Sequence, residues 1–312
     1  MLRSPLFHIT HVVDRLDDAL DCHRRLFLRP ALDGGYWDVP RRHAIFTFVG
    51  GVWIEAMAPD GRGGGLRAFV DRFGSRWHSL AWYVKGIDDL ADELHRRGVR
   101  FYDSDGDRIT GAVPRHGPMP LPPGYRRDYP PDWTSAVLYT NFRDAHGMLE
   151  LCEPSTDHPL PPRWVDDDMR SDTDPLGIVT TSHQTTVVPG CDAAARFFVD
   201  AFGGHLFHQS ENPALGVRSA FVVVGEGRGT VLELAEPIAN GPARDDLEVC
   251  QRPVLHRTTF RVRDLGAVRE HLAAEGFGVE FDCDGLIVTD PASTVGARFA
   301  FTDRDLVDDP RC

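Results

Sequence analysis

The sequence contains an internal repeat, and this repeat constrains the fold more than any other feature of the chain. The segment HSLAWYV, His78–Val84, returns as HRTTFRV, His256–Val262, and each copy leads into an amphipathic stretch that ends at a glycine. The same shift of 178 positions carries Glu55, in the strand-like run IEAMAP, onto Glu233 in LELAEP. Such a chain is expected to fold as two similar halves.

Each half also begins with a related pair of elements, which divides the chain into four units. From Phe7 and again from Ser182, a short β-rich run leads into a stretch of helical period. In the first copy the residues Leu16, Leu20 and Phe27 fall on one apolar face of that helix. We therefore expect an α+β protein of four units, each made of a strand, a helix and several further strands.

Composition shifts mark the boundaries between the predicted domains. We expect the first two units within residues 1–155 and the last two within residues 178–304. Residues 156–177 between them are rich in proline and aspartate and poor in apolar residues, which is typical of a linker. Residues 305–312 form a short tail.

A proline-rich segment, residues 110–133, interrupts the second unit and has no counterpart in the fourth. A long irregular insertion in a compact domain is either a functional lid or an ornament. If it is a lid, Tyr125 and Arg126 are the side chains that we expect to reach a bound substrate.

The overall composition excludes several classes of function. The 312 residues are 42% hydrophobic and carry a net charge of −13, which argues against nucleic acid or an anionic membrane as the partner. No apolar run is long enough for a membrane span, and six scattered cysteines without a CxxC pair indicate reduced thiols. We therefore expect a cytoplasmic protein with a small-molecule substrate, and a homodimer is compatible with this composition.

Three glutamates occupy equivalent positions inside apolar strand-like runs. Glu150 lies between two leucines in LELCEP, Glu233 lies between two leucines in LELAEP, and Glu55 lies between isoleucine and alanine in IEAMAP. Alternate residues of a strand face opposite sides, so each carboxylate is expected to point into a cavity. A buried carboxylate is costly without a counter-charge, which predicts a metal ion or another cation nearby.

Four such units, with a histidine in the first strand of a half and a glutamate in its last strand, resemble the vicinal oxygen chelate superfamily. This group includes glyoxalase I, methylmalonyl-CoA epimerase, the extradiol dioxygenases and the bleomycin resistance proteins. The matching motifs are HITHVVDRLDDAL (His8–Leu20), DAHGMLELCEP (Asp144–Pro154) and DPASTVGARFAF (Asp290–Phe301). The resemblance covers nearly the whole chain and implies four βαβββ modules paired into two half-open β-barrel domains around a divalent metal.

The resemblance implies that His8, His78 and Glu150 are the metal ligands. The family places its second histidine at the position of Ser79, so His78 lies one residue early. A shift by one residue turns a strand side chain to the opposite face, unless a β-bulge restores its direction. Either His78 or Ser79 is therefore expected to face the cavity.

The second half resembles a degenerate copy of the first. Its final strand has Ala300 where the family has glutamate, and Arg257 places a cation at a ligand position. In some relatives the units exchange partners, and unit two would then join unit three. That alternative site would add His183 and Glu233 to the ligands of unit two.

The implied ligand set suits Fe²⁺, Mn²⁺, Ni²⁺, Co²⁺ or Zn²⁺. The function expected from the resemblance is proton transfer through a metal-bound enolate, as in an isomerase, epimerase or lyase. Glu55 and Tyr83 are the predicted catalytic residues, and Ser79 and Trp53 are predicted to bind substrate.

Two alternatives remain open at this stage. An Fe(II)-dependent dioxygenase acting on an aromatic or related substrate would use the same ligands, although Asn141 stands where the extradiol enzymes have tyrosine. A non-catalytic binding protein of the resistance type would instead use Trp53, Trp82 and Tyr83 to line an apolar cleft.

Overall fold

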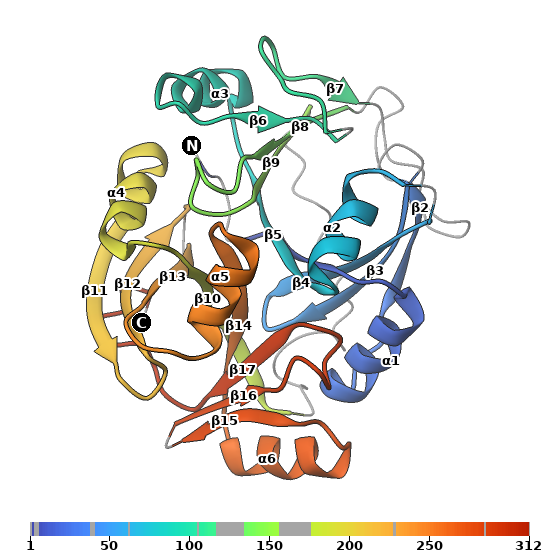
Figure 1. Ribbon diagram of the computed structural model, residues 1–312, viewed down its shortest axis with the longest axis vertical. Helices are drawn as coiled ribbons and strands as arrows, with labels where there is room; N and C mark the ends of the chain where they lie inside the picture. The colour runs from blue at the N-terminus through green and yellow to red at the C-terminus, as the bar shows by residue number, and fades with distance from the viewer. Residues whose placement is uncertain are drawn as a thin grey trace.

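A computed structural model of the chain describes residues 2, 6–37, 41–61, 63–104, 106–116, 134–155, 176–226, 229–283 and 285–311. The described strands form two mixed sheets, one in each half of the sequence. Figure 1 shows the first half in blue to green at the right and top, and the second half in yellow to red at the left and bottom. No helix among the described residues is long and apolar enough to cross a membrane.

The first sheet has the strand order β2-β3-β4-β1-β5-β9-β8-β6, with β7 paired to β8. Its strands are β1 (His8–Val12), β2 (Leu32–Trp37), β3 (Arg42–Val49), β4 (Val52–Pro59), β5 (Arg76–Tyr83), β6 (Phe101–Tyr102), β7 (Arg115–His116), β8 (Ser135–Thr140) and β9 (Leu149–Pro154). The helices of this half are α1 (Leu16–Phe27), α2 (Gly65–Phe73) and α3 (Ile87–Arg96).

The second sheet repeats this order as β11-β12-β13-β10-β14-β17-β16-β15. Its strands are β10 (Ile178–Val187), β11 (His205–Asn212), β12 (Val217–Val224), β13 (Thr230–Pro237), β14 (Val254–Val262), β15 (Val279–Cys283), β16 (Leu286–Thr289) and β17 (Arg298–Thr302). The helices are α4 (Cys191–Phe202), α5 (Pro242–Cys250) and α6 (Leu265–Ala274).

In both sheets the first strands of two consecutive units lie side by side. Strand β1 runs parallel to β4 of its own unit and antiparallel to β5 of the next unit. Strand β10 is placed in the same way between β13 and β14. The α+β fold of four βαβββ units in two sheets is therefore confirmed, and unit two joins unit one and not unit three.

The ends of two helices follow the sequence pattern. Helices α3 and α6 are followed at Gly98 and Gly276 by left-handed backbone, with φ of 81° and 72°. Glycine adopts this conformation without a steric penalty, so it ends a helix cleanly. Both repeat copies therefore stop where the two glycines predict.

Helices α2 and α5 were not anticipated from the sequence. Each connects the last strand of one unit to the first strand of the next, so they are counterparts in the repeat. Glycines precede both helices, and the segment before α2, GRGGG, suggests a loop. The apolar residues Phe69 and Val70 nevertheless bury one face of α2, and tertiary packing of this kind stabilises short helices.

The two halves share one apolar core at the outer faces of their central strands. Trp77 of β5 lies edge-on to Phe299 of β17, with ring centroids 5.1 Å apart, and Phe27 of α1 contacts Phe299 at the same centroid distance. His11 points to this side of the sheet, as its odd spacing from His8 predicts, and its Nε2 lies 2.9 Å from the carbonyl oxygen of Val295.

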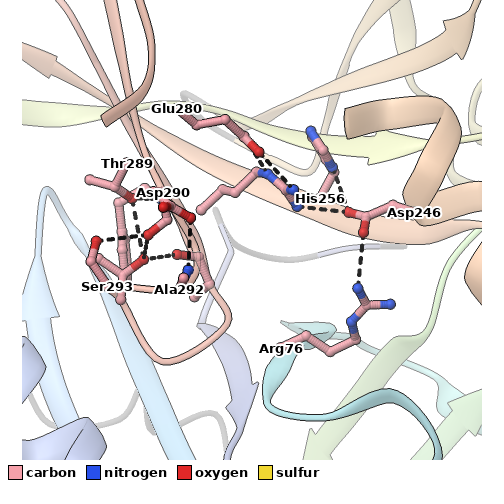
Figure 2. A network of polar contacts seen from close by, with 12 residues as sticks. Arg76, Asp246, His256, Glu280, Thr289, Asp290, Ala292 and Ser293 are labelled. Atoms are coloured by element: carbon pink, nitrogen blue, oxygen red, sulfur yellow. Dashed lines mark hydrogen bonds and ion pairs between the residues drawn. The ribbon is translucent and has the colours of Figure 1, made fainter. Parts of the chain in front are cut away.

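A buried polar network also joins the halves (Figure 2). Arg76 of β5 pairs with Asp246 of α5 at 2.9 Å, and the same carboxylate accepts hydrogen bonds from His256 at 2.8 Å and Arg298 at 2.9 Å. Burial alone would raise the pKa of Asp246, but these three partners hold it well below its usual range. The network fixes α5 of the second half against the first sheet.

Candidate functional site

Two of the three predicted ligands of the first half, His8 and Glu150, lie in one row across the sheet. Strand register places His8 of β1 opposite Trp53 on one side and Ala81 on the other. Ala81 is in turn opposite Glu150, which is opposite Tyr139 of β8. Residues in register point to the same face of a sheet. His8 and Glu150 therefore share a face although 142 positions separate them in the chain.

The terminal atoms of three side chains meet on this face. Nε2 of His8 lies 3.3 Å from Oε2 of Glu55 and 3.3 Å from Oε2 of Glu150. The other oxygen of Glu55 accepts a hydrogen bond from Arg42 at 2.6 Å. All four residues are at least 93% buried. The structure thus brings His8, Glu55 and Glu150 together, and it adds Arg42, which was not among the predicted site residues.

The electrostatics of this cluster couple His8 to Glu150, and each shifts the pKa of the other. Burial alone would lower the pKa of His8, but Glu150 and then Glu55 outweigh it and raise that pKa above its ordinary value. Burial would likewise raise the pKa of Glu150, but His8 and Arg42 lower it. His8 therefore keeps its ring proton to a higher pH than a free imidazole does, and in its protonated form it is a cation between the two carboxylates.

A β-bulge at His78 answers the question of which residue faces the cavity. Thr10 of β1 pairs with Ser79, but the next residue of β1 pairs with Trp77, so His78 is the extra residue of the bulge. His78 and Ser79 consequently both line the same cavity, with Nδ1 of His78 3.2 Å from Oγ of Ser79. Burial and the nearby Arg252 lower the pKa of His78 to about 4.

The cavity beside this row has a volume of about 640 Å³. Strands that are not neighbours in the sheet contribute to its wall, since Arg42, Ser79 and Tyr139 come from β3, β5 and β8. The sheet must therefore curve around it. Aromatic residues of α2 and of the β8–β9 connection close one side, and Arg252 reaches in from the second half.

Most residues of this cavity were absent from the sequence-based prediction, and Arg42, Tyr139 and Arg252 are three polar ones among them. Arg42 opens the run RHAIFTFV, in which every second residue shares its face, so its direction was open to inference. Tyr139 follows from the same alternation in SAVLYT. The position of Arg252 has no local signal, because it depends on how the two halves pack.

The remaining predicted residues lie at different distances from the cavity. Ser79 lines it, whereas Trp53 and Tyr83 are not among its lining residues. The cluster of His8, Glu55 and Glu150 is not among them either and lies behind the wall that Arg42, Ser79 and Tyr139 form. The ring of Trp53 lies 5.0 Å from that of Phe48, and the ring of Tyr83 lies 4.5 Å from that of Phe7. Tyr125 and Arg126 fall outside the described residues.

The second sheet holds a related cluster that is closed by an arginine. Oε2 of Glu233 lies 3.4 Å from Nε2 of His183 and 2.8 Å from the guanidinium of Arg257. Burial alone would raise the pKa of Glu233, but Arg257 brings it well below its ordinary range. Ala300 stands opposite Thr259 just as Glu150 stands opposite Ala81. The exchanged arrangement is not the one found, since His183 and Glu233 stay together in the second sheet.

As the side chains stand, no group of three or more His, Cys, Asp and Glu residues in the described chain is arranged to hold a metal ion. His8 itself fills the gap between the carboxylates of Glu55 and Glu150. The donor chemistry nevertheless fits a divalent ion, since one imidazole nitrogen and two carboxylate oxygens converge in a buried place. Their spacing of 3.3 Å is near the roughly 3 Å between adjacent ligands when bonds of about 2.1 Å meet at right angles.

Comparisons with known proteins agree with this architecture. Residues 182–284 match the family model of the Glyoxalase/Bleomycin resistance protein/Dioxygenase superfamily. A search of curated proteins gave no sequence match. The match to the family model covers about a third of the chain and lies in the second half, whose sheet repeats the strand order of the first.

Two solved structures are similar in fold over nearly the full length, and a third matches a shorter part of the chain. A variant of 4-hydroxymandelate synthase from Streptomyces coelicolor is similar at 15% identity and a TM-score of 0.65, covering 98% of this chain and 94% of that one. A hypothetical protein from Staphylococcus aureus is similar at 9% identity and a TM-score of 0.57, covering 97% and 99%. Methylmalonyl-CoA epimerase from Mycobacterium tuberculosis matches 41% of this chain and 89% of its own, at 20% identity and a TM-score of 0.38.

Proposed function

We propose that this protein is a divalent-metal-dependent enzyme that moves a proton on a small oxygenated organic substrate in the cavity of the first half. The observation that carries the proposal is the contact of His8 with both Glu55 and Glu150 on the buried, cavity-facing side of the sheet. Three such groups, in a site that excludes water, supply donor atoms of the kinds that metal binding and proton transfer require.

His8, Glu150 and His78 are the residues that would hold the metal, with Glu55 as a further ligand or as the base. A bound divalent ion would supply Lewis acidity that polarises a substrate carbonyl. Binding of the ion would displace the proton that His8 carries between the carboxylates, because a ligating imidazole must be neutral. The position of His78 at the bulge and on the cavity wall supports its assignment as the second imidazole.

Glu55 is the proton acceptor in this proposal. The hydrogen bond from Arg42 to Oε1, at 2.6 Å, fixes the carboxylate and leaves Oε2 directed toward His8. With 2% of its surface exposed, Glu55 is shielded from bulk water, which prevents the proton from exchanging with solvent during transfer.

Tyr139 is the hydrogen-bond donor in this proposal, because it lines the cavity and Tyr83 does not. Burial, together with the charge of Glu150, raises the pKa of Tyr139 well above its ordinary value. Its hydroxyl therefore keeps its proton at neutral pH and can donate a hydrogen bond to a substrate oxygen.

Metal analysis of purified variants tests the proposal. Glu150→Gln and His8→Gln should lose bound metal, because each removes a ligand. Glu233→Gln is the matched control, since it makes the same change at the repeat-related glutamate of the second sheet, and it should keep its metal. Full metal content in Glu150→Gln, or loss in Glu233→Gln alone, would contradict the assignment.

The same measurements separate the two other functions. Iron in the purified protein, with oxygen uptake on adding substrate, would favour an Fe(II)-dependent dioxygenase that uses His8, His78 and Glu150 as a facial triad. A wild-type protein that takes up none of Fe²⁺, Mn²⁺, Ni²⁺, Co²⁺ or Zn²⁺ would overturn the metalloenzyme proposal and favour a binding protein.

A further inference from the structure

Arg252 belongs to the second half but lies in the cavity of the first. It follows helix α5 by two residues, and its guanidinium carbon stands 3.6 Å from the ring centroid of Phe142 and 4.6 Å from that of Phe73. Within the described residues its guanidinium has cation–π contacts but neither a hydrogen bond nor an ion pair. Its hydrogen-bonding edge is therefore available to a ligand.

Contacts between the halves hold Arg252 in this place. The ion pair between Arg76 and Asp246, at 2.9 Å, fixes α5 against the first sheet. At the end of α5 the chain turns at Gln251, whose φ is 54°, and the carbonyl oxygen of Gln251 accepts a hydrogen bond of 3.0 Å from Arg143. The backbone before Arg252 is thus tied to both halves.

The surroundings of Arg252 lack a matching negative charge. The cavity is also lined by Arg72 and by Arg42, which pairs with Glu55, and Asp103 is the carboxylate among its described lining residues. Partial burial and the neighbouring arginines lower the pKa of Arg252 to about 10. A partly buried cation among other cations is unfavourable by itself, so an anion that enters the cavity gains from neutralising it.

We propose that Arg252 binds the carboxylate of the substrate, and that the substrate is a small organic acid with an aromatic body. A guanidinium offers two parallel N–H groups that match a carboxylate. Phe69, Phe73 and Phe142 supply aromatic contacts for the body, and a cavity of about 640 Å³ is of ordinary size for a small-molecule site. This inference names the substrate class of the proposed active site and rests on that proposal.

The second half, whose own cluster is closed by Arg257, then has a role in the activity of the first. It supplies the residue that selects an anionic substrate, from a position that the first half alone cannot provide. Specificity therefore depends on the packing between the halves and not on the row of residues around His8.

Calorimetric titration of the full-length protein with phenylacetate and benzoate tests this inference. Phenylacetamide, the neutral analogue of phenylacetate, serves as the ligand control, and inorganic phosphate tests whether any anion suffices. Phenylacetate should bind at least 10-fold more tightly than phenylacetamide and than phosphate. Equal affinity for phenylacetate and phenylacetamide, tighter binding of phosphate, or no binding of either acid would overturn the inference.

Variants locate the binding to Arg252. Arg252→Leu should weaken phenylacetate binding by about 10- to 100-fold, the usual range for a lost charge-assisted hydrogen bond. Arg252→Lys keeps the positive charge but loses the two parallel N–H groups of the guanidinium. Its affinity for phenylacetate should lie between those of the wild type and Arg252→Leu. Arg196→Leu changes an exposed arginine on α4 and should bind as the wild type does. An unchanged affinity in Arg252→Leu would refute the assignment.

Metal content measured on the same samples keeps the two proposals apart. Arg252→Leu should retain its metal, and metal-depleted Glu150→Gln should still prefer phenylacetate over phenylacetamide. If Arg252→Leu retains its metal and binds phenylacetate as the wild type does, the assignment of Arg252 is contradicted and the metalloenzyme proposal is not. Absence of metal from the wild type, with acid binding that depends on Arg252, would sink only the metalloenzyme proposal.

Discussion

Two buried histidines, His11 and His23, should make the protein sensitive to mild acid. Neither side chain is exposed, and Nδ1 of His11 lies 3.5 Å from Nε2 of His23. Their other ring nitrogens contact Val295 O at 2.9 Å and Thr47 Oγ1 at 3.2 Å. Burial lowers the pKa of His11 to about 4, and burial with the neighbouring His11 lowers the pKa of His23 to about 3.

The sign and size of the effect follow from linkage. In the unfolded chain both histidines titrate near pH 6.5, so below that pH the unfolded state binds more protons and stability falls. The stability that the two neutral histidines contribute is fully present above pH 6.5. It is lost as the pH falls toward their pKa values in the folded protein. At about 1.36 kcal/mol per pH unit, each histidine lowers the free energy of unfolding at pH 5.0 by about 2 kcal/mol, and the pair lowers it by about 4 kcal/mol.

Urea unfolding at pH 7.5 and 5.0 measures this loss. His23→Gln removes one titrating group and keeps a side chain that can hydrogen-bond to Thr47. Between pH 7.5 and 5.0 the variant should therefore lose about 2 kcal/mol less unfolding free energy than the wild type does. Comparing differences between pH values cancels the constant cost of the substitution. His205→Gln changes an exposed histidine of β11 and should leave the difference unaltered. Equal pH dependence in His23→Gln and the wild type would refute the reasoning.

Two further substitutions test the packing between the halves. Gly296→Ala should lower the free energy of unfolding by at least about 2 kcal/mol in thermal melts, because the added Cβ would lie 1.7 Å from the carbonyl oxygen of Ser75 at a φ of +84°. Gly111→Ala meets nothing within 4 Å and should change stability by less than about 0.5 kcal/mol. Asp246→Asn should destabilise by about 3 kcal/mol in urea unfolding, because it removes the negative charge that pairs with Arg76 across the interface. An unaltered midpoint for Asp246→Asn would show that the network adds nothing to the attachment of α5.

The repeat and the strand alternation determined much of the candidate site. Because side chains alternate along a strand, the positions of Glu55 and Glu150 between apolar residues were enough to place both on a buried face. The sequence also shows that the second half has Ala300 in place of the last carboxylate and Arg257 at a ligand position. In the structure, Arg257 forms an ion pair with Glu233.

Other features were decided only by tertiary structure. The direction of His78 depends on a bulge, and a bulge is a property of how β5 pairs with β1. Helix α2 was missed because its glycine-rich start resembles a loop, although its buried face packs against the sheet.

The cavity of the first half shows the physical limit of local sequence signals. Periodicity reports which face a residue takes, since that depends on its own strand alone. The meeting of His8 with Glu150 depends on strand register across 142 positions, and the arrival of Arg252 depends on contacts between the halves. The sequence alone therefore determined the unit, its repetition and the inward carboxylates, whereas strand pairing and packing decided which groups became neighbours, because contact distances are set by the folded chain as a whole.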